Sequence, residues 1–354
     1  MNNIFYIDGG KLADVVNRLK KSHRIFSPVV KSRGANKETE YSYKILANSD
    51  APAFSPYRAV EPLKSFFTYF KEPVAGYFTS GRDMVDLERT IIFGVKSCDI
   101  AGHRVQDFVF LEGVETDTLY RARRDNTILI SSDCTDYKKA CHCLAWEILP
   151  YPTYGFDLNL SPLNDGYLVE AGSKRGEVLI GQYREYFSPA SAAQKAARQA
   201  KRDDITDRLN KYLAPQGLVS KTIVQKLMKD GYAADTWQQF MQTCVECGGC
   251  NLICDTCHCF LLGDAKGGQG NEKVRVWDSC LYANYARVAG GANPLKLRAQ
   301  RLRNRFVKKF DFFVDNMGVP ACCGCGRCIE VCPGKIDIRE VLKDLAKKVA
   351  VNDK

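Results

Sequence analysis

Two runs of cysteine residues with the same spacing constrain this chain more than any other feature of its sequence. Each run has the pattern C-x2-C-x2-C-x3-C, and Pro333 directly follows the second run. The runs consist of Cys244, Cys247, Cys250 and Cys254, and of Cys322, Cys325, Cys328 and Cys332. Bacterial ferredoxins carry this pattern, and in those with two clusters the fourth cysteine of each run binds the other [4Fe-4S] cluster.

We therefore predict two [4Fe-4S] clusters with crossed ligands. The first cluster is expected to bind Cys244, Cys247, Cys250 and Cys332, and the second Cys322, Cys325, Cys328 and Cys254. Glycines within the runs let backbone N–H groups approach the sulfur atoms; these are Gly248, Gly249, Gly324 and Gly326. Structural zinc is the alternative, but it uses two C-x2-C pairs rather than two runs of four. Cys323 does not keep the two-residue gap to Cys325, so we expect it not to be a ligand.

The chain has 354 residues and 16 cysteines. This length favours two domains over a single core. The N-terminal sequence MNNIFYIDGG lacks the charged and apolar regions of a secretory signal, and no apolar run reaches the length of a membrane span. We therefore expect a cytoplasmic protein whose cysteines bind metal rather than form a disulfide framework.

The formal net charge of the chain is +10 at pH 7. Each cluster with its four thiolates carries about −2, so two clusters would leave about +6 on the loaded protein. This excess would favour an acidic partner such as ferredoxin. The most basic run, residues 296–309, is nearly free of aromatic residues and is interpreted as the solvated face of a helix, not as a nucleic-acid-binding stripe.

Residues 1–187 are predicted to form an α/β domain with a parallel sheet. Extended segments are expected at 24–31, 40–47, 90–99 and 126–134, and helices at 10–22 and 100–111. The order strand, helix, strand from residue 90 to residue 134 is typical of a parallel βαβ unit. In this unit the two strands end at Cys98 and Cys134.

Four cysteines of this domain suggest a third cluster. The carboxyl ends of neighbouring parallel strands meet at one edge of a sheet, where open α/β folds bind ligands. Cys98 and Cys134 would lie at that edge, and Cys141 and Cys143 could complete the ligand set from the following loop. The alternative is that these four residues are small buried hydrophobic side chains, which is a common role of cysteine.

The rest of the chain is predicted to be helical around the two runs. Residues 188–240 are expected to form a helical bridge that begins with Ser188 as its N-cap. Residues 241–354 are expected to form a ferredoxin-like dicluster domain with a helical insertion at about 261–320. Within that insertion the glycine-rich segment 263–272 is interpreted as a flexible linker and two helices are expected over about 294–317. A last helix is expected at about 337–349.

A second group of cysteines follows the first run: Cys257, Cys259 and Cys280, with His258 between the first two. One interpretation is that these residues pack near the first cluster and tune its potential through burial and hydrogen bonds to sulfur. The other is that some of them bind a further metal.

Several longer motifs resemble the iron–sulfur proteins of the anaerobic sulfite reductase and sulfhydrogenase beta-subunit family. They cover nearly the whole chain: RIFSPVV (24–30), SCDIAG (97–102), DFVFLEG (107–113), YRARR (120–124), the C-x6-C-x-C pattern at 134–143, TCHCF (256–260), RVWDSC (275–280), AGG (289–291) and the two cysteine runs. The chain departs from the family at Asp255, where proline is usual after the fourth cysteine. That proline shapes a turn and is not a ligand.

This resemblance implies an iron–sulfur protein that relays electrons within a multisubunit oxidoreductase. The donor would be a flavin- and NAD(P)H-binding reductase subunit, whereas the acceptor would be a sirohaem-containing sulfite reductase subunit or a nickel–iron hydrogenase pair. The sequence contains no GxGxxG, Walker A, HExxH or GxSxG pattern, so we expect no substrate or nucleotide site and no catalytic residue in this chain. A standalone iron–sulfur oxidoreductase, with flavin or substrate at the α/β domain, is the alternative. A nucleic-acid-binding cluster sensor is a third.

Overall fold

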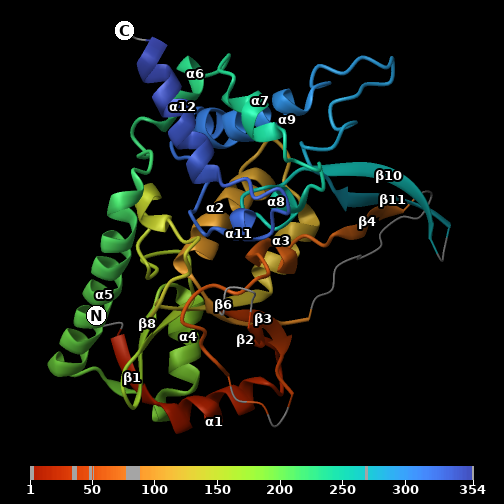
Figure 1. Ribbon diagram of the computed structural model, residues 1–354. Coiled ribbons are helices and arrows are strands. Elements are labelled where there is room, and N and C mark those ends of the chain that lie inside the picture. The colour runs from red at the N-terminus through yellow and green to blue at the C-terminus, as the bar shows by residue number, and fades with distance from the viewer. Residues whose placement is uncertain are drawn as a thin grey trace.

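The computed structural model describes residues 4–33, 38–47, 50, 52–76, 88–267 and 270–352. Its amino-terminal part is built on an eight-stranded sheet with the order β3-β2-β5-β6-β7-β8-β1-β9. The strands are β1 (Ile4–Asp8), β2 (Arg24–Arg33), β3 (Thr39–Ile45), β5 (Thr90–Val95), β6 (Thr127–Ser132), β7 (Leu158–Pro162), β8 (Gly166–Ala171) and β9 (Ser188–Pro189). Figure 1 shows this sheet in the lower half of the molecule.

The predicted α/β domain is present, but its sheet is mixed rather than parallel. Strands β2, β5, β6 and β7 pair in parallel, whereas β3, β8, β1 and β9 are joined to the sheet by antiparallel pairing. The expected βαβ unit forms the parallel centre. The antiparallel additions arise where short connections, such as the turn between β7 and β8, cannot make a crossover.

Strand β5 is buried along its whole length, because helices cover both faces of the sheet. Ile91 and Phe93 pack into a core with α1 (Gly9–Leu19) and α4 (Lys174–Gln182), whereas Ile92 and Val95 pack with α2 (Ser97–Leu111) and α3 (Thr118–Asp125). Gly94, at φ +72°, lies at a register shift between Phe93 and Val95, and this shift places Val95 on the same face of the sheet as Ile92. A Cβ on Gly94 would lie 2.9 Å from the Pro28 ring. The connection from β5 into α2 thus directs Cys98 to the carboxyl edge of the sheet.

The predicted helical bridge divides between the two halves of the molecule. Helix α5 (Ala192–Leu213) lies along the sheet, while α6 (Val224–Asp230) and α7 (Thr236–Met241) join a second core with α9 (Arg298–Val307) and α12 (Ile338–Asn352) (Figure 1). The N-cap of α5 is Ser191, whose side chain and Gln194 form a capping box. The prediction that Ser188 is the N-cap of this helix was wrong, because Ser188 and Pro189 pair with β1.

The insertion between the two runs is not wholly helical. It contains β10 (Phe260–Gly267) and β11 (Gly270–Trp277), which form a hairpin and pair with β4 (Lys71–Gly76). The segment interpreted as a flexible linker is therefore largely strand, with residues 268–269 outside the described part. From Gly263 on, exposed positions of β10 alternate with positions of intermediate exposure. This pattern fits a hairpin that extends from the molecule (Figure 1).

Two helices were expected over 294–317, but residues 298–317 form one helix, whereas the helix expected at 337–349 is present. The first is continuous from α9 through a π-helical segment (Lys308–Phe312) into α10 (Phe313–Met317), and the second is α12. The remaining short elements are the 3₁₀ helices Leu63–Phe66, Cys143–Trp146, Arg184–Tyr186 and Ala214–Gln216, and the single turns α8 (Gly249–Leu252) and α11 (Arg327–Glu330). Helices α8 and α11 each follow a glycine of one cysteine run and contact each other between the two cores.

Candidate metal centre

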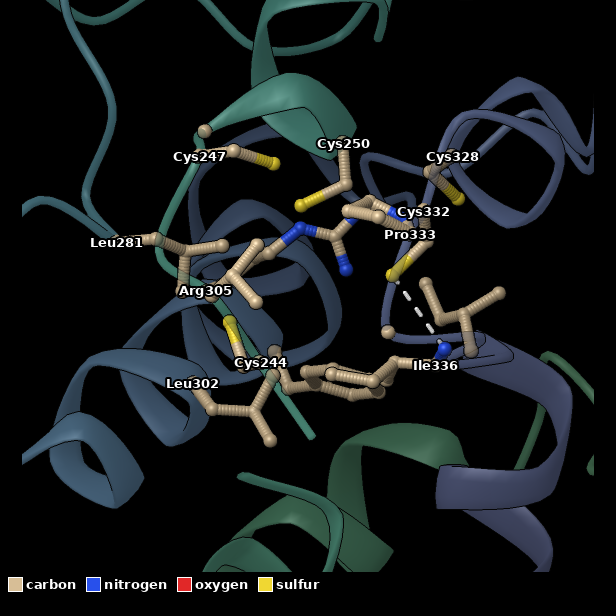
Figure 2. Close-up of a pocket in the computed structure, with 15 residues that line it drawn as sticks. Cys244, Cys247, Cys250, Leu281, Leu302, Arg305, Cys328, Cys332, Pro333 and Ile336 are labelled. Carbon is tan, nitrogen blue, oxygen red and sulfur yellow. Dashed lines mark hydrogen bonds between the residues drawn. The ribbon is translucent and has the colours of Figure 1, made fainter. Parts of the chain in front are cut away.

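The first group of thiols lines one pocket at the end of the helical core. Cys244, Cys247, Cys250 and Cys332 all border it, with Cys328 at its edge (Figure 2). Gly248 begins α8 at φ +71°, and a Cβ there would lie 2.8 Å from the Tyr282 ring. The structure therefore brings together the four residues that were predicted as ligands of the first cluster.

Backbone N–H groups reach two of these sulfur atoms. The amide of Glu246 donates to Cys244 Sγ at 3.4 Å, and the amide of Ile336 donates to Cys332 Sγ at 3.4 Å; Figure 2 draws the second bond. Hydrogen bonds to sulfur favour the thiolate and tune the potential of a cluster that it binds. The turns after Cys244 and Cys332 therefore point backbone N–H donors at sulfur, which stabilises a thiolate at both positions.

The second group of thiols is more deeply buried. Burial is the main reason that the pKa of Cys322 and of Cys328 is raised to about 12. Lys309 Nζ donates both to Cys254 Sγ at 3.4 Å and to the carbonyl of Ala321, the residue before Cys322, at 3.1 Å, so Cys254 lies near the start of the second run. A hydrogen bond from Cys323 lowers the pKa of Cys325 to about 6. The structure therefore also brings Cys254 of the first run to the three leading cysteines of the second run, as the crossed pattern predicted.

Three cations on one face of a helix are buried near the cysteine runs, where Arg301 pairs with Glu246 and the other two face thiols. Arg301, Arg305 and Lys309 are buried, although the basic run 296–309 was expected to be solvated. That expectation was wrong for these residues, because they recur every fourth position and so share the inner face of the helix. Lys309 Nζ donates to Cys254 Sγ at 3.4 Å. The thiols Cys250 and Cys328 raise the pKa of Arg305 well above its ordinary value, although burial alone would lower it.

The residues present fit two iron–sulfur clusters. Arg305 Nη2 is buried without a hydrogen-bond partner among the described residues, and Figure 2 shows its guanidinium among Cys250, Cys328 and Cys332. An unsatisfied buried donor is costly, and an inorganic sulfide would accept from it. No three cysteine, histidine or acidic side chains in the described part of the chain are spaced for one shared metal ion. The corners of a cubane separate its ligands farther than a single ion does.

The four cysteines of the α/β domain also come together. Cys98 lies in the first turn of α2 rather than at a strand end, Cys134 follows β6, and Cys141 and Cys143 lie in the next loop. Burial raises the pKa of Cys134 to about 12, and Cys141 contributes. Burial also raises the pKa of Cys143, and the neighbouring Cys141 and Cys134 raise it as well. Burial raises the pKa of Cys98 too, and Cys134 is among the groups that add to this shift. We call these four residues the sheet-edge group.

A fully buried lysine faces the sheet-edge group. Lys96 Nζ donates to Ser132 Oγ at 2.7 Å and to the Asp133 carbonyl at 3.1 Å. Burial lowers the pKa of Lys96, while the nearby Cys134 thiol opposes that shift more than any other group. A buried cation is expensive unless it is compensated by negative charge. The site therefore has the electrostatics of a place that holds thiolates.

The second run packs directly on the loop of the sheet-edge group. The amide of His142 donates to the Gly324 carbonyl at 2.8 Å. A Cβ on Gly324 would lie 2.6 Å from the Cys143 backbone, and one on Gly326 would lie 2.4 Å from the Ala140 carbonyl oxygen. These glycines, at φ +62° and +75°, therefore permit a close approach between two loops as well as the turn geometry.

A buried ion network joins the same two regions. Arg327 Nη1 donates to Asp99 at 2.6 Å and to Asp255 at 3.2 Å. Its other nitrogens donate to the carbonyls of residues 59–61. Asp255 also accepts from the Lys64 amide at 2.9 Å. The departure from proline at position 255 is thus explained by a carboxylate that ties the first run to Arg327 of the second.

Sequence reasoning missed Arg327, Arg305, Lys309 and Lys96. The four-residue spacing of Arg301, Arg305 and Lys309 was a usable signal, since it matches one helix face. No sequence signal pointed to Arg327, because its partners Asp99 and Asp255 are distant from it in sequence. His103 and Arg124, which flank this region on α2 and α3, pair with Asp107.

The fold and the paired runs define an iron–sulfur protein of the dicluster class. Residues 243–336 match the family described as 4Fe-4S dicluster domain. The chain is similar to sulfhydrogenase 2 subunit beta of Pyrococcus furiosus, with 28% identity over 340 residues that cover 93% of this chain and 94% of that protein. Both comparisons agree with the resemblance stated from the motifs, and residues 243–336 are similar to a 4Fe-4S dicluster domain. In the described part, no helix has the length and apolar character needed to cross a bilayer.

Proposed function

We propose that this chain is the electron-transfer subunit of a multisubunit oxidoreductase and has no substrate site of its own. The observation that carries the proposal is that three groups of four cysteines lie next to one another. Bound clusters would supply one-electron redox chemistry, and the protein would fix their spacing and solvent exposure. A chain of neighbouring redox sites is what a relay requires.

The proposed ligand sets follow the crossed pattern. The first cluster takes Cys244, Cys247, Cys250 and Cys332; the second takes Cys322, Cys325, Cys328 and Cys254; the third takes the sheet-edge group. Support for a third cluster comes from the convergence of four thiols, of which Cys141 and Cys143 are buried, and of Lys96 at one edge of the sheet. Four cysteines acting only as small hydrophobic residues would not need a buried cation beside them.

The order of the relay is proposed from contacts between the groups. The loop of the second set that holds Gly324 packs on the sheet-edge loop, where the His142 amide donates to the Gly324 carbonyl at 2.8 Å. Cys328 of the second set borders the pocket that the first set lines. The second cluster would therefore stand between the other two, and electrons would enter at one end and leave at the other.

The exposed end of the relay is the first cluster. Cys247 is exposed, whereas Cys325, Cys141 and Cys143 are buried. We propose that a redox partner docks at Cys247, while a second partner reaches the sheet-edge group through the pocket that Cys134 lines with Arg198, Lys201 and Arg208. The proposed donor is a flavin- and NAD(P)H-binding reductase subunit. The proposed acceptor is a nickel–iron or sirohaem subunit, with ferredoxin as a further acidic partner.

Anaerobic purification through a tag on this chain, followed by mass spectrometry of co-eluting proteins, tests the proposal. A flavoprotein together with a nickel–iron pair is the expected result, and a sirohaem subunit in place of that pair would assign the relay to sulfite reduction. Elution of the chain alone, with clusters intact and a bound flavin in its visible spectrum, would contradict the proposal and favour a standalone oxidoreductase.

A further inference from the structure

The cysteines that follow the first run line a pocket of their own. Cys257, His258, Cys259 and Cys280 all border it, together with Asp278. The pocket adjoins the first two proposed sites, because Arg305 borders both it and the pocket of the first group, and Lys309, which also lines it, donates to Cys254 Sγ at 3.4 Å. None of these residues belongs to the three ligand sets described above.

The thiols of this pocket face one another and share polar neighbours. After burial, the largest influence on the pKa of Cys280 is Cys259, and both raise it. Asn251 Nδ2 donates to Cys280 Sγ at 3.1 Å, and Cys257 Sγ lies 3.7 Å from Asn251 Oδ1. The Tyr285 hydroxyl lies 3.5 Å from Cys259 Sγ. Cys257 and Cys280 therefore contact the same Asn251 amide, and Cys259 lines the same pocket.

Cations line the same pocket. Lys308 Nζ donates to Tyr285 at 2.7 Å, and Lys309 and Arg305 are buried in its wall. The second guanidinium nitrogen of Arg305 has no partner among the described residues. Buried positive charge is stable when it faces negative charge, so the pocket is suited to thiolates and an anionic group that they hold.

The local structure repeats that of the sheet-edge group. Both contain the sequence Cys-His-Cys, at 141–143 and at 257–259. In both, histidine Nδ1 pairs with the carbonyl two residues earlier, at 2.9 Å for His142 and 3.2 Å for His258. In both, a further cysteine lies just beyond the end of a strand: Cys134 after β6 and Cys280 after β11. The difference is that Cys98 supplies a fourth thiol only in the sheet-edge group.

We propose that Cys257, Cys259 and Cys280 hold a further [4Fe-4S] cluster, with His258 Nε2 as its fourth ligand. The Nδ1 bond to a backbone carbonyl leaves Nε2 with the lone pair, which is the arrangement of metal-binding histidines. The cluster would lie beside the second cluster at the base of the β10–β11 hairpin. This inference rests on the proposed function only in taking the chain to be loaded with iron and sulfide.

The test is the metal content of the anaerobically reconstituted full chain. Cys259→Ala and Cys280→Ala should each lose about four irons and four sulfides per chain, the content of one cubane. The double variant should lose no more than either single variant, because one cluster is removed. Cys323→Ser, which lies outside every proposed ligand set and keeps a hydrogen-bond donor beside Cys325, is the matched control and should keep the full iron content.

Electron paramagnetic resonance of the same samples separates the outcomes. The signals of the clusters in the two runs should persist in the variants, and His258→Asn should change the spectrum of the additional cluster without lowering the signals of the others. Unchanged iron in Cys259→Ala and Cys280→Ala, or zinc in place of iron, would overturn the inference. If Cys280→Ala fails to fold, the partly exposed Cys259 decides alone. A wild-type chain without any cluster would instead overturn the proposed function.

Discussion

The two ferredoxin runs and the sheet-edge group, both proposed here as cluster sites, bring their cysteines together by different routes. In the runs, three ligands come from one short loop and only the fourth crosses over, so the site is largely local. In the sheet-edge group, Cys98, Cys134 and the loop 141–143 are delivered by α2, by the end of β6 and by a connection. The first design depends on spacing and the second on the fold, so they should respond differently to substitution.

Removal of one sheet-edge thiol is expected to have the largest effect. Cys134→Ala should lose about four irons per chain, the content of one cubane, because three remaining thiols of a fold-built site cannot hold it. The signals of the clusters in the two runs should remain. Iron analysis and electron paramagnetic resonance measure both. An iron content equal to that of the wild type would mean that the group is only a packed core.

The second prediction breaks the ion network between the two regions. Arg327→Met should destabilise the protein by about 3–5 kcal/mol, because Asp99 and Asp255 would remain buried without a cation. Their side chains are 2% and 0% exposed. Urea unfolding under anaerobic conditions measures the change. The control is Arg104→Met, which breaks an exposed pair with Glu112 and should cost at most about 1 kcal/mol. Equal effects for the two variants would refute the role of the network.

The third prediction concerns acid sensitivity beneath the sheet-edge region. Burial lowers the pKa of His103 to about 4, against 6.5 for the free side chain, while Asp107 opposes and Arg124 supports the shift. Between these values the unfolded chain binds a proton that the folded chain does not, so His103 makes stability fall as the pH falls from 6.5 to 4. His103→Phe should remove up to about 3 kcal/mol of that fall.

The measurement is the difference in unfolding free energy between the wild type and His103→Phe at several pH values. Taking a difference removes the acid sensitivity that the two proteins share, including that of the clusters. A difference that stays constant from about pH 7 to about pH 4 would show that the pKa of His103 does not change on folding.

The smallest effect is expected where the two regions touch. Gly326→Ala should cost about 2 kcal/mol, because φ is +75° and the new Cβ would meet the Ala140 carbonyl. Gly290→Ala is the control, since a Cβ there meets nothing within 4 Å. Thermal unfolding compares the two. If Gly326→Ala is as well tolerated as the control, the loops do not pack as closely as described.

The same comparison explains what the sequence could predict. The runs were readable because spacing alone determines which thiols can share a cubane, and the convergence of Cys254 with the second run followed from it. The convergence of the sheet-edge cysteines could be predicted only from the rule that neighbouring parallel strands end at the same edge of a sheet. The antiparallel strands β1 and β9, the hairpin at 263–272 and the pairing of Arg327 with Asp99 depend on contacts distant in sequence, which periodicity does not encode.

Local capping signals were also overridden by tertiary pairing. Ser188 has the residue type and position of an N-cap, yet the segment pairs with β1 and the helix begins after Ser191. The basic run 296–309 shows the converse error, because charge was taken as a sign of exposure. Neighbouring thiols favour the charged forms of Arg305 and Lys309 although both are buried, so these buried cations support a site for thiolates.

The central claim is that the cluster sites are close enough to form one relay. Electron paramagnetic resonance of the fully reduced, anaerobically loaded chain tests it most directly, because neighbouring paramagnetic clusters couple magnetically. The account predicts broadened, fast-relaxing signals in the wild type, and a simpler spectrum in Cys134→Ala, where one end of the relay is missing. Sharp signals of independent clusters in the wild type, unchanged by that substitution, would contradict it.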